Sequence, residues 1–289
     1  MINAQTKLFG LLGNPVGHSL SPFMQNIFLE QCGVNGVYLA FAVAPDKVGD
    51  ALRGMFALGV QGANVTIPYK EAVIPYLCGM SKAAQACNAV NTLIYTEKGY
   101  YGDNTDGAGL LAALAREHDW RPEGRKILVV GAGGAARGVS VAMALQGAAE
   151  ICIANRSAEH AAALAEQIES LGNVKATAVP LEQLQKEALY TQYHTIVNTT
   201  SLGMSPHVER MIPLRAELLD AEHLVVDLVY NPLETRLLRT AKEHGAKTAS
   251  GLGMLLYQGA LAFEAWTGKA VDPEPVRQRM IAQLSGAAQ

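Results

Sequence analysis

Short apolar runs alternate with amphipathic segments along almost the whole chain. The runs at 7–13, 37–43 and 61–67 predict strands, and the segments at 21–33 and 46–59 between them predict helices. Strands that alternate with helices in this way are typical of βα units rather than of a helical bundle or a β-sandwich. The pattern therefore predicts an α/β fold.

Local signals mark the ends of the first predicted helix. Ser21 is expected at its N-cap, Pro22 at the first helical position and Gly33 at its stop. Farther along, the segment 98–118 predicts the end of a strand or hairpin and then a second helix opening from it.

A second α/β unit is predicted after the polar segment WRPEGRK at 120–126. The strand KILVVG leads into a Gly- and Ala-rich helix, and strand and helix then alternate again to about residue 250. The predicted strands are 126–131, 150–155, 195–200 and 223–230, and the predicted helices are 160–172 and 237–245, with two more in the tail at 251–268 and 273–284.

Composition narrows the class of protein. The chain has 289 residues, 49% of them hydrophobic, which is enough for one or two globular domains. A net charge of −3 provides no general field that would attract nucleic acid or an anionic membrane. No uncharged run approaches the roughly 20 residues of a membrane span, and the first apolar run is too short for a signal peptide. We therefore expect a cytoplasmic protein.

The cysteines and histidines do not form a metal-binding pattern. The four cysteines are far apart, without a CxxC pair, and none of the seven histidines belongs to an HExxH or HxH pair. We expect reduced thiols and no metal site. The cysteines are Cys32, Cys78, Cys87 and Cys152.

The segment GAGGAARG indicates a nucleotide site. It matches the pattern G-x-G-x-x-A with Gly131, Gly133 and Ala136, after an apolar strand and before a helix. Small residues at these positions permit a tight turn, close approach of the backbone to a pyrophosphate, and close packing of the helix. A Gly- and Ala-rich helix contact without a nucleotide is the alternative reading.

The end of the following strand indicates which nucleotide binds. A site for NAD commonly has an acidic residue there for the ribose hydroxyls, whereas a 2′-phosphate requires a cation. This chain has Asn155, Arg156 and Ser157, and a guanidinium can bind a phosphate with two parallel bonds. The sequence therefore predicts NADP rather than NAD, with a solvated loop arginine as the alternative.

Polar residues in the first half of the chain predict a substrate site. Ser19 and Ser21 lie at a predicted helix N-terminus, where hydroxyl and N–H groups favour a carboxylate. Seven more polar residues lie at predicted strand ends or turns, where α/β sheets bind ligands. Together they suit a polyhydroxylated acid. The seven are Asn64, Thr66, Lys70, Asn91, Thr92, Asn104 and Asp106.

From about residue 8 to the tail, the chain closely resembles the shikimate dehydrogenase family, NADP-dependent enzymes of aromatic biosynthesis. The resemblance implies reversible reduction of 3-dehydroshikimate to shikimate, on the pathway to chorismate and the aromatic amino acids. The motifs that carry it are GNPVGHSLSP, NVTIPYK, NAVNT, GDNTDG, GAGGAAR, NRS, NTTSLGM, DLVYNPLET and GLGMLLYQG.

The resemblance also implies roles for particular residues. Lys70 and Asp106 would form the catalytic pair, with Lys70 either a true acid/base group or chiefly a positioning and electrostatic group. The remaining substrate residues would be Ser19, Ser21, Thr66, Asn91, Gln258 and Tyr230. The cofactor residues would be Gly131, Gly133, Gly134, Ala135, Ala136, Asn155, Arg156 and Ser157, with Thr200, Ser201, Gly203, Met204, Gly253 and Met254 near the nicotinamide.

The same resemblance implies two domains. Residues 1–107, completed by the C-terminal helices at 253–289, would form an α/β substrate domain, and residues 108–252 a Rossmann-like NADP domain. A cleft between them would hold both ligands and close around them. The chain is expected to work as a monomer or a homodimer on a small molecule.

Two positions depart from the pattern of relatives. Gln25 stands where relatives commonly have histidine, which we expect to alter only local packing. His160 stands where relatives often have a second arginine, which weakens the expectation of strict NADP selectivity. If its imidazole binds the 2′-phosphate, the KM for NADP should rise between about pH 6 and 8.

Three other functions compete with this reading. A quinate/shikimate dehydrogenase of dual specificity shares the chemistry, and a catalytically inactive nucleotide-sensing relative shares the fold. Retention of both Lys70 and Asp106 argues against the inactive relative. Glutamyl-tRNA reductase has a similar cofactor segment, but its N-terminal catalytic cysteine and tRNA contacts are not apparent in this sequence.

Overall fold

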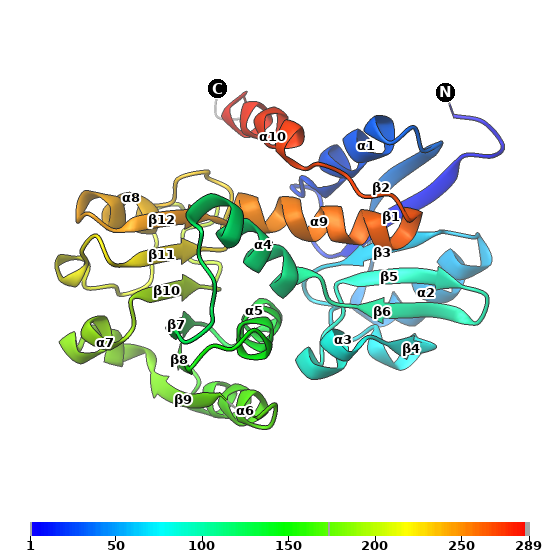
Figure 1. Ribbon diagram of the computed structural model, residues 1–289. Helices are drawn as coiled ribbons and strands as arrows, with labels where there is room; N and C mark the ends of the chain where they lie inside the picture. Colours follow the sequence, from blue (N-terminus) through cyan, green and yellow to red (C-terminus); the bar gives the residue numbers. More distant parts are fainter. Residues whose placement is uncertain (1, 173, 287–289) are drawn as a thin grey trace. The chain divides into compact units, whose positions relative to one another are not determined.

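The computed structural model describes residues 2–172 and 174–286 of the chain (Figure 1). The described residues form two compact units, one comprising 2–109 together with 255–283, and the other comprising 110–172, 174–254 and 284–286. Each unit has a six-stranded sheet of its own. The predicted α/β class, with a Rossmann-like second unit, is confirmed.

The first unit contains the beginning of the described chain. Its elements are β1 (Lys7–Gly13), α1 (Ser21–Gln31), β2 (Gly36–Ala42), α2 (Val48–Ala57), β3 (Gly62–Val65), β4 (Gly79–Met80), α3 (Lys82–Cys87), β5 (Thr92–Thr96), β6 (Gly99–Asp103) and α10 (Glu274–Gly286). Helices α4 (Asp106–His118) and α9 (Gly251–Thr267), like the last residues of α10, belong partly to this unit and partly to the other.

The sheet of the first unit mixes parallel and antiparallel strands, in the order β2-β1-β3-β5-β6-β4. Strands β2 and β3 flank β1 in parallel, while β5 runs antiparallel to both β3 and β6. In the register, Thr92 pairs with Asn64 on one side and with Asp103 on the other. The beginning of β5 therefore lies at the same sheet edge as the ends of β3 and β6.

Helix α1 begins one residue earlier than its sequence predicts. Its N-cap is Leu20, without a side-chain cap, and Ser21 is the first helical residue. The prediction that Ser21 is the N-cap was wrong. The reason is local: the Ser19 hydroxyl accepts a hydrogen bond of 3.2 Å from the Ser21 amide, and Leu20 already has helical backbone angles. Gly33, at φ +59°, follows the end of the helix as expected.

The second unit is built from regular βα repeats. Its elements are β7 (Lys126–Val130), α5 (Gly134–Leu145), β8 (Glu150–Asn155), α6 (Ala158–Glu169), β9 (Lys175–Pro180), α7 (Glu187–Gln192), β10 (Thr195–Asn198), β11 (Leu224–Asp227), α8 (Arg236–Glu243) and β12 (Lys247–Ser250).

All six strands of this second sheet are parallel, in the order β12-β11-β10-β7-β8-β9 (Figure 1). The order reverses between β7 and β10, which is the arrangement of doubly wound dinucleotide-binding folds. In such sheets, ligands bind outside the carboxyl ends of the strands at this reversal. The segments that follow β7 and β10 are therefore the first candidates for a cofactor site.

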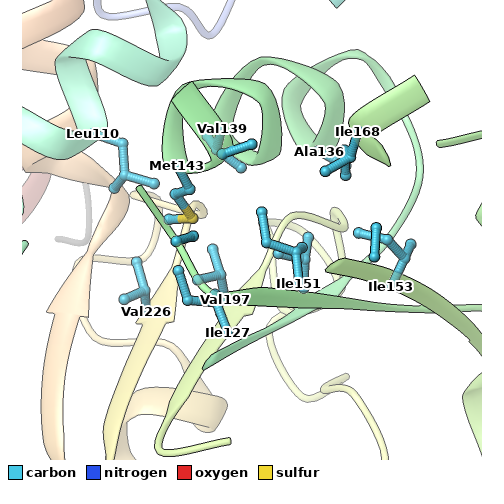
Figure 2. Packing of buried hydrophobic residues seen from close by; sticks show 14 of the residues in the cluster. Leu110, Ile127, Ala136, Val139, Met143, Ile151, Ile153, Ile168, Val197 and Val226 are labelled. Carbon is cyan, nitrogen blue, oxygen red and sulfur yellow. The ribbon is translucent and has the colours of Figure 1, made fainter. Parts of the chain in front are cut away.

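The core of the second unit explains why its strands were visible in the sequence. Ile127 and Ile151 face a cluster under α5, together with Val139 and Met143 of that helix (Figure 2). The alternate strand residues Leu128, Val130, Cys152 and Ala154 face a second buried cluster. Because both faces of a parallel sheet are covered, its strands are nearly continuous apolar runs.

The helices are short. The longest among the described residues, α9, has 17 residues, whereas a helix needs about 20 to span a bilayer. Within 2–172 and 174–286, no helix combines the length and apolarity needed to cross a membrane.

Candidate active site

A nearly buried ion pair forms the centre of the site in the first unit. Lys70 lies in the segment after β3, Asp106 is the first residue of α4, and Lys70 Nζ lies 2.5 Å from Asp106 Oδ2. Only 16% of the lysine side chain and 6% of the aspartate side chain are exposed. Because little water screens the two charges, their interaction is much stronger than that of a surface pair.

The backbone around Lys70 is held at several points. A turn joins the Tyr69 amide to the Thr66 carbonyl at 2.9 Å, and the buried Tyr69 side chain donates its hydroxyl to the Val43 carbonyl. The Lys70 carbonyl accepts a hydrogen bond of 2.7 Å from the Val90 amide. The lysine therefore projects from a fixed backbone position, beside the segment that leads into β5.

Asn91 orients the carboxylate of Asp106. Its Nδ2 donates to Asp106 Oδ1 at 2.8 Å and to Thr105 Oγ1 at 3.1 Å, while its Oδ1 accepts from the Thr105 amide at 2.8 Å. The two carboxylate oxygens of Asp106 thus have different partners, Asn91 for one and Lys70 for the other. This arrangement leaves the carboxylate little freedom to turn.

Gln258 reaches the same cluster from α9. Its Oε1 lies 3.4 Å from Asn91 Nδ2, although 167 residues separate them in the chain, and its carbonyl accepts from Thr105 Oγ1 at 3.1 Å. A methyl group at Gly109 would lie 2.5 Å from the Gln258 amide nitrogen. The glycine on α4 therefore permits the close approach of α9 that brings Gln258 to the pair.

Three further predicted substrate residues lie at the same edge of the sheet. Ser19 and Ser21 follow β1, and Thr66 follows the neighbouring strand β3. Ser21 is 6% exposed, and a methyl group at Gly13, the last residue of β1, would lie 2.3 Å from Thr66 Cγ2. The structure thus groups these residues at the edge that carries Lys70, while their contacts with a substrate stay predictions.

Two residues that the sequence did not single out support this group. Thr105, inside the GDNTDG motif, bonds Asn91 and Gln258 as given above. Tyr38, on β2, donates its hydroxyl to Asn64 Oδ1 at 2.8 Å, and burial raises the pKa of that hydroxyl well above its ordinary value. Tyr38 is thereby kept a neutral donor, and Asn64 in turn donates to the Asn91 carbonyl at 3.2 Å.

Gln25 joins α1 to α9 within the first unit. Its side chain is 1% exposed and donates to the Gly259 carbonyl at 2.9 Å. Its Oε1 is buried without a hydrogen-bond partner among the described residues. Gln25 therefore makes a packing contact next to Gln258.

In the second unit, the segment after β7 has the geometry of a phosphate-binding loop. Gly131 has φ +114°, and a methyl group there would lie 2.4 Å from Thr199 Oγ1, so only glycine fits without strain. Helix α5 begins at Gly134 with Gly133 at its N-cap and no side-chain cap. A methyl group at Gly133 would meet no atom within 4 Å. The first-turn N–H groups lack intrahelical acceptors, so the loop fits a pyrophosphate.

The other residues of the predicted phosphate loop complete this turn. Ala135 lies in the first turn of α5, and Ala136 is fully buried in the cluster under that helix. A small residue at Ala136 therefore lets α5 pack closely on the sheet, as the sequence pattern implies.

The segment after β8 fits the adenosine end of NADP. Ser157 caps α6 by accepting from the His160 amide at 3.3 Å, and Asn155 Nδ2 donates to the Ser157 carbonyl at 3.1 Å. Arg156 and His160 are both exposed at this corner. Since no carboxylate stands at 155–157, an exposed guanidinium here suits a 2′-phosphate better than a free ribose hydroxyl.

The residues expected near the nicotinamide also belong to the second unit. Thr200, Ser201, Gly203 and Met204 follow β10, the neighbour of β7 at the reversal of strand order, and Met204 is 48% exposed. Tyr230 follows β11.

Gly253 and Met254 lie in α9. A methyl group at Gly253 would lie 2.4 Å from Glu117 Oε1, and Met254 is 8% exposed inside the core cluster. The contacts of Met254 and Gly253 with a nicotinamide, like those of Tyr230 with a substrate, stay predictions.

In the part of the chain that the structure describes, no three His, Cys, Asp or Glu side chains gather as a group that could hold a metal ion.

Comparisons with known proteins agree along the whole chain. The family description "Shikimate dehydrogenase substrate binding domain" matches residues 11–93, "Shikimate / quinate 5-dehydrogenase" matches 113–230, and "Shikimate 5'-dehydrogenase C-terminal domain" matches 251–281. The shikimate dehydrogenase (NADP(+)) of Methanopyrus kandleri is 44% identical over 98% of both chains.

Solved structures give the same result. A crystal structure of a shikimate dehydrogenase in complex with NADP+ has a TM-score of 0.91 and 42% identity, covering 98% of both chains. Shikimate 5-dehydrogenase from Listeria monocytogenes, in complex with shikimate and NAD, has a TM-score of 0.90 and 37% identity, covering 96% of this chain and 98% of that one.

Proposed function

The chain belongs to the shikimate dehydrogenase family, and from that premise we propose how its own residues interconvert shikimate and 3-dehydroshikimate. The protein is an NADP-dependent oxidoreductase of the shikimate pathway, which leads to chorismate and the aromatic amino acids. The observation that carries the proposal is the shielded pair of Lys70 and Asp106 inside a group of hydroxyl-binding side chains.

Lys70 moves the proton of the reaction. Oxidation of shikimate removes a hydride from C3 and a proton from the hydroxyl on the same carbon, and NADP, when bound, takes the hydride. In this direction the neutral amine of Lys70 receives the proton and becomes an ammonium, and in the reverse direction the ammonium gives the proton to the ketone oxygen. Because the ammonium has three N–H donors and Asp106 occupies one, two remain for the substrate oxygen.

Asp106 keeps Lys70 in place and binds the same substrate hydroxyl. Its Oδ2 is bonded by the lysine and its Oδ1 by Asn91, so the position of each oxygen is fixed before the substrate arrives. Preorganised groups of this kind need little rearrangement when charge develops on the reacting oxygen. The pair therefore stabilises the charge that forms as hydride is transferred.

The surrounding residues set the orientation of the ring. Ser19 and Ser21 offer hydroxyl groups near the N-terminus of α1, where the helix favours an anion, and they bind the substrate carboxylate. Thr66, Asn91 and Gln258 bind the ring hydroxyls, and Tyr230 adds a further contact. With both ends of the ring held, C3 has one position relative to Lys70.

The second unit binds NADP through its backbone and one guanidinium. The first turn of α5, with Gly133, Gly134 and Ala135, bonds the pyrophosphate. Arg156 bonds the 2′-phosphate, with Asn155 and Ser157 shaping the turn that carries it.

A matched pair of lysine variants tests the catalytic assignment. Lys70→Met should lower the rate of hydride transfer, measured in single turnover at saturating shikimate and NADP, by about 10²- to 10⁴-fold. Lys82→Met changes an exposed lysine of the same unit and should leave the rate unchanged. A folded Lys70→Met variant that transfers hydride at the parent rate would refute the role of Lys70.

Quinate is the second candidate substrate. The family description that matches residues 113–230 covers both shikimate and quinate enzymes. Quinate differs from shikimate by the saturated ring and a hydroxyl on the carbon that bears the carboxylate, so discrimination would occur at Ser19 and Ser21. Turnover of both acids by the same preparation separates a strict enzyme from one of dual specificity.

We also propose that the enzyme acts in the cytoplasm, where its pathway intermediates are small soluble acids, as a monomer or a homodimer. Both catalytic residues, Lys70 and Asp106, come from one chain, so neither state requires a residue from a second copy. Light scattering coupled to gel filtration decides the oligomeric state, and fractionation of cells the compartment.

A further inference from the structure

Asp227 is a buried carboxylate that the proposed mechanism does not use. It is the last residue of β11, at the carboxyl edge of the second sheet, and it has no exposed surface. An isolated carboxylate at such a position would be costly, because burial removes its hydration. Its surroundings therefore need to supply several donors.

Three hydrogen bonds reach this carboxylate from three residues. Asn198 Nδ2, at the end of β10, donates to Oδ1 at 2.9 Å, and the Val229 amide donates to the same oxygen at 3.1 Å. The hydroxyl of Thr235, the N-cap of α8, donates to Oδ2 at 2.6 Å. No cation contributes to this set, so burial outweighs the bonds and raises the pKa of Asp227 to about 6.

Asn198 connects Asp227 to the segment after β10 by hydrogen bonds. Its Oδ1 accepts from the Thr200 amide at 3.1 Å and from the Thr200 hydroxyl at 2.7 Å. That hydroxyl in turn accepts from the Leu202 amide at 3.3 Å. A continuous chain of bonds therefore runs from Thr235 through Asp227 and Asn198 to the segment that carries Ser201, Gly203 and Met204.

Two connections are thus fixed by one side chain. The segment 199–204 follows β10 and holds the residues assigned to the nicotinamide, and the segment 228–235 follows β11 and holds Tyr230. A further backbone bond of 3.0 Å joins the amide of Ser205, the residue directly after the first segment, to the carbonyl of Asn231 in the second. Neither segment has a helix or strand of its own between these residues, so their shape depends on such cross-links.

We propose that Asp227 is a positioning residue for the reaction, which ties the segment 199–204 to the segment 228–235 and thereby fixes the nicotinamide end of the cofactor site. The inference rests on the proposed function for the identity of the cofactor. It adds a residue that touches neither substrate nor cofactor and acts through Asn198 and Thr200.

The variant Asp227→Asn keeps the size of the side chain and changes its bonding. One oxygen becomes an amide NH₂ group, which cannot accept the hydroxyl proton of Thr235, so the bond that Thr235 donates in the parent is lost. We expect kcat to fall and the dissociation constant for NADPH to rise, each by about tenfold, which corresponds to about 1.4 kcal/mol. The dissociation constant for shikimate alone should change less than twofold, since most of its proposed contacts lie in the first unit.

A pair of threonine variants tests the same bond, together with the cap bond that the Thr235 hydroxyl accepts from the Leu238 amide. Thr235→Val removes the hydroxyl at nearly constant volume and should lower kcat, whereas Thr235→Ser retains the hydroxyl and should restore it. This pair keeps the inference testable if Asp227→Asn folds poorly.

Glu150→Gln is the matched control. Glu150 is also a buried carboxylate of the second sheet, 5% exposed, and it accepts from Tyr193 and Lys175 at 2.8 and 3.0 Å. It begins β8, so it lies at the amino edge of the parallel sheet rather than at the ligand edge. We expect Glu150→Gln to alter the melting temperature while kcat and the NADPH dissociation constant stay within twofold of the parent.

The outcomes separate this inference from the proposed function. Parent kcat and NADPH affinity in Asp227→Asn, or equal kcat in Thr235→Val and Thr235→Ser, would overturn the positioning role while shikimate turnover by the parent still upheld the function. A loss of kcat in Glu150→Gln as large as that in Asp227→Asn would also overturn it, because the loss would then follow from changing any buried carboxylate of the sheet. Absence of turnover by the parent would refute the proposed function. The NADPH dissociation constants of the parent and Asp227→Asn, measured by fluorescence, would still test the role of Asp227.

Discussion

Lys70→Met should lower both the free energy of unfolding and the rate of hydride transfer. Adding Asp106→Asn should restore the free energy of unfolding but not the rate. In the parent, the lysine side chain is 16% exposed and the aspartate side chain 6% exposed. Removing one partner of such a pair leaves a buried charge and costs about 3–5 kcal/mol. We expect the lower end, about 3 kcal/mol, because Asn91 still bonds Oδ1 and some water reaches the site.

The double variant separates the two effects. With Asp106→Asn, the buried charge is gone and the side chain can still bond Asn91, so the free energy of unfolding should return to within about 1 kcal/mol of the parent. Hydride transfer should stay about 10²- to 10⁴-fold slower, because no proton donor has been restored. Urea unfolding at pH 7 and single-turnover rates, measured on the parent, both single variants and the double variant, give the complete cycle.

An exposed pair of the same unit is the control. Arg53 Nη2 lies 2.6 Å from Asp50 Oδ1, with side chains 67% and 60% exposed. The effects of Arg53→Met and Asp50→Asn on the free energy of unfolding should be additive, because water screens the two charges. Neither variant should change the rate of hydride transfer. Additivity of the Lys70 and Asp106 variants as well, or recovery of the rate in their double variant, would refute the reasoning.

Three further predictions concern the second unit. Arg156→Ala should raise the KM for NADP by about 10- to 100-fold, the loss of one charge-assisted bond, and leave the KM for NAD within about twofold in steady-state assays. Gly131→Ala should lower the free energy of unfolding by at least about 1–2 kcal/mol in urea titrations, because its φ is +114° and Thr199 leaves no room, whereas Gly133→Ala should keep stability and weaken only NADPH binding. Burial raises the pKa of Asp227 from 3.8 to about 6, so the folded state binds this proton more tightly than the unfolded state does. The resulting contribution to the free energy of unfolding is fully present below about pH 4 and is lost as the pH rises through about 6. Relative to Asp227→Asn, the parent should therefore lose about 3 kcal/mol of unfolding free energy between about pH 4 and 7, and a constant difference would contradict this.

Much of the fold was readable from the sequence because buried parallel strands are apolar on both faces. The run KILVV became β7, whose residues alternate between two covered clusters. The edge strands β9 and β12 were missed because KATAVP and KTAS are short and contain lysine and threonine, so they lack such a run. The N-cap of α1 was misplaced because the bond from the Ser21 amide to the Ser19 hydroxyl is a local detail that residue preferences do not resolve.

The site was only partly readable from the residues themselves. Their types and places at strand ends predicted a polar edge, but only the family resemblance singled out Lys70 and Asp106, which are 36 residues apart. The contact of Asn91 with Gln258 spans 167 residues and depends on the path of α9. Asp227 begins the motif DLVYNPLET but was given no role from the sequence, because its proposed role depends on three donors that the fold brings to it.

The central claim is tested most directly by the initial rate of reduced-cofactor formation by the purified protein, with shikimate or quinate in turn and NADP or NAD in turn. The account predicts fast turnover with shikimate and NADP and much slower turnover with the other three pairs. Comparable rates with quinate would assign the chain to the dual-specificity branch, and comparable rates with NAD would contradict the role of Arg156. No turnover with any pair would contradict the catalytic role of Lys70 and Asp106.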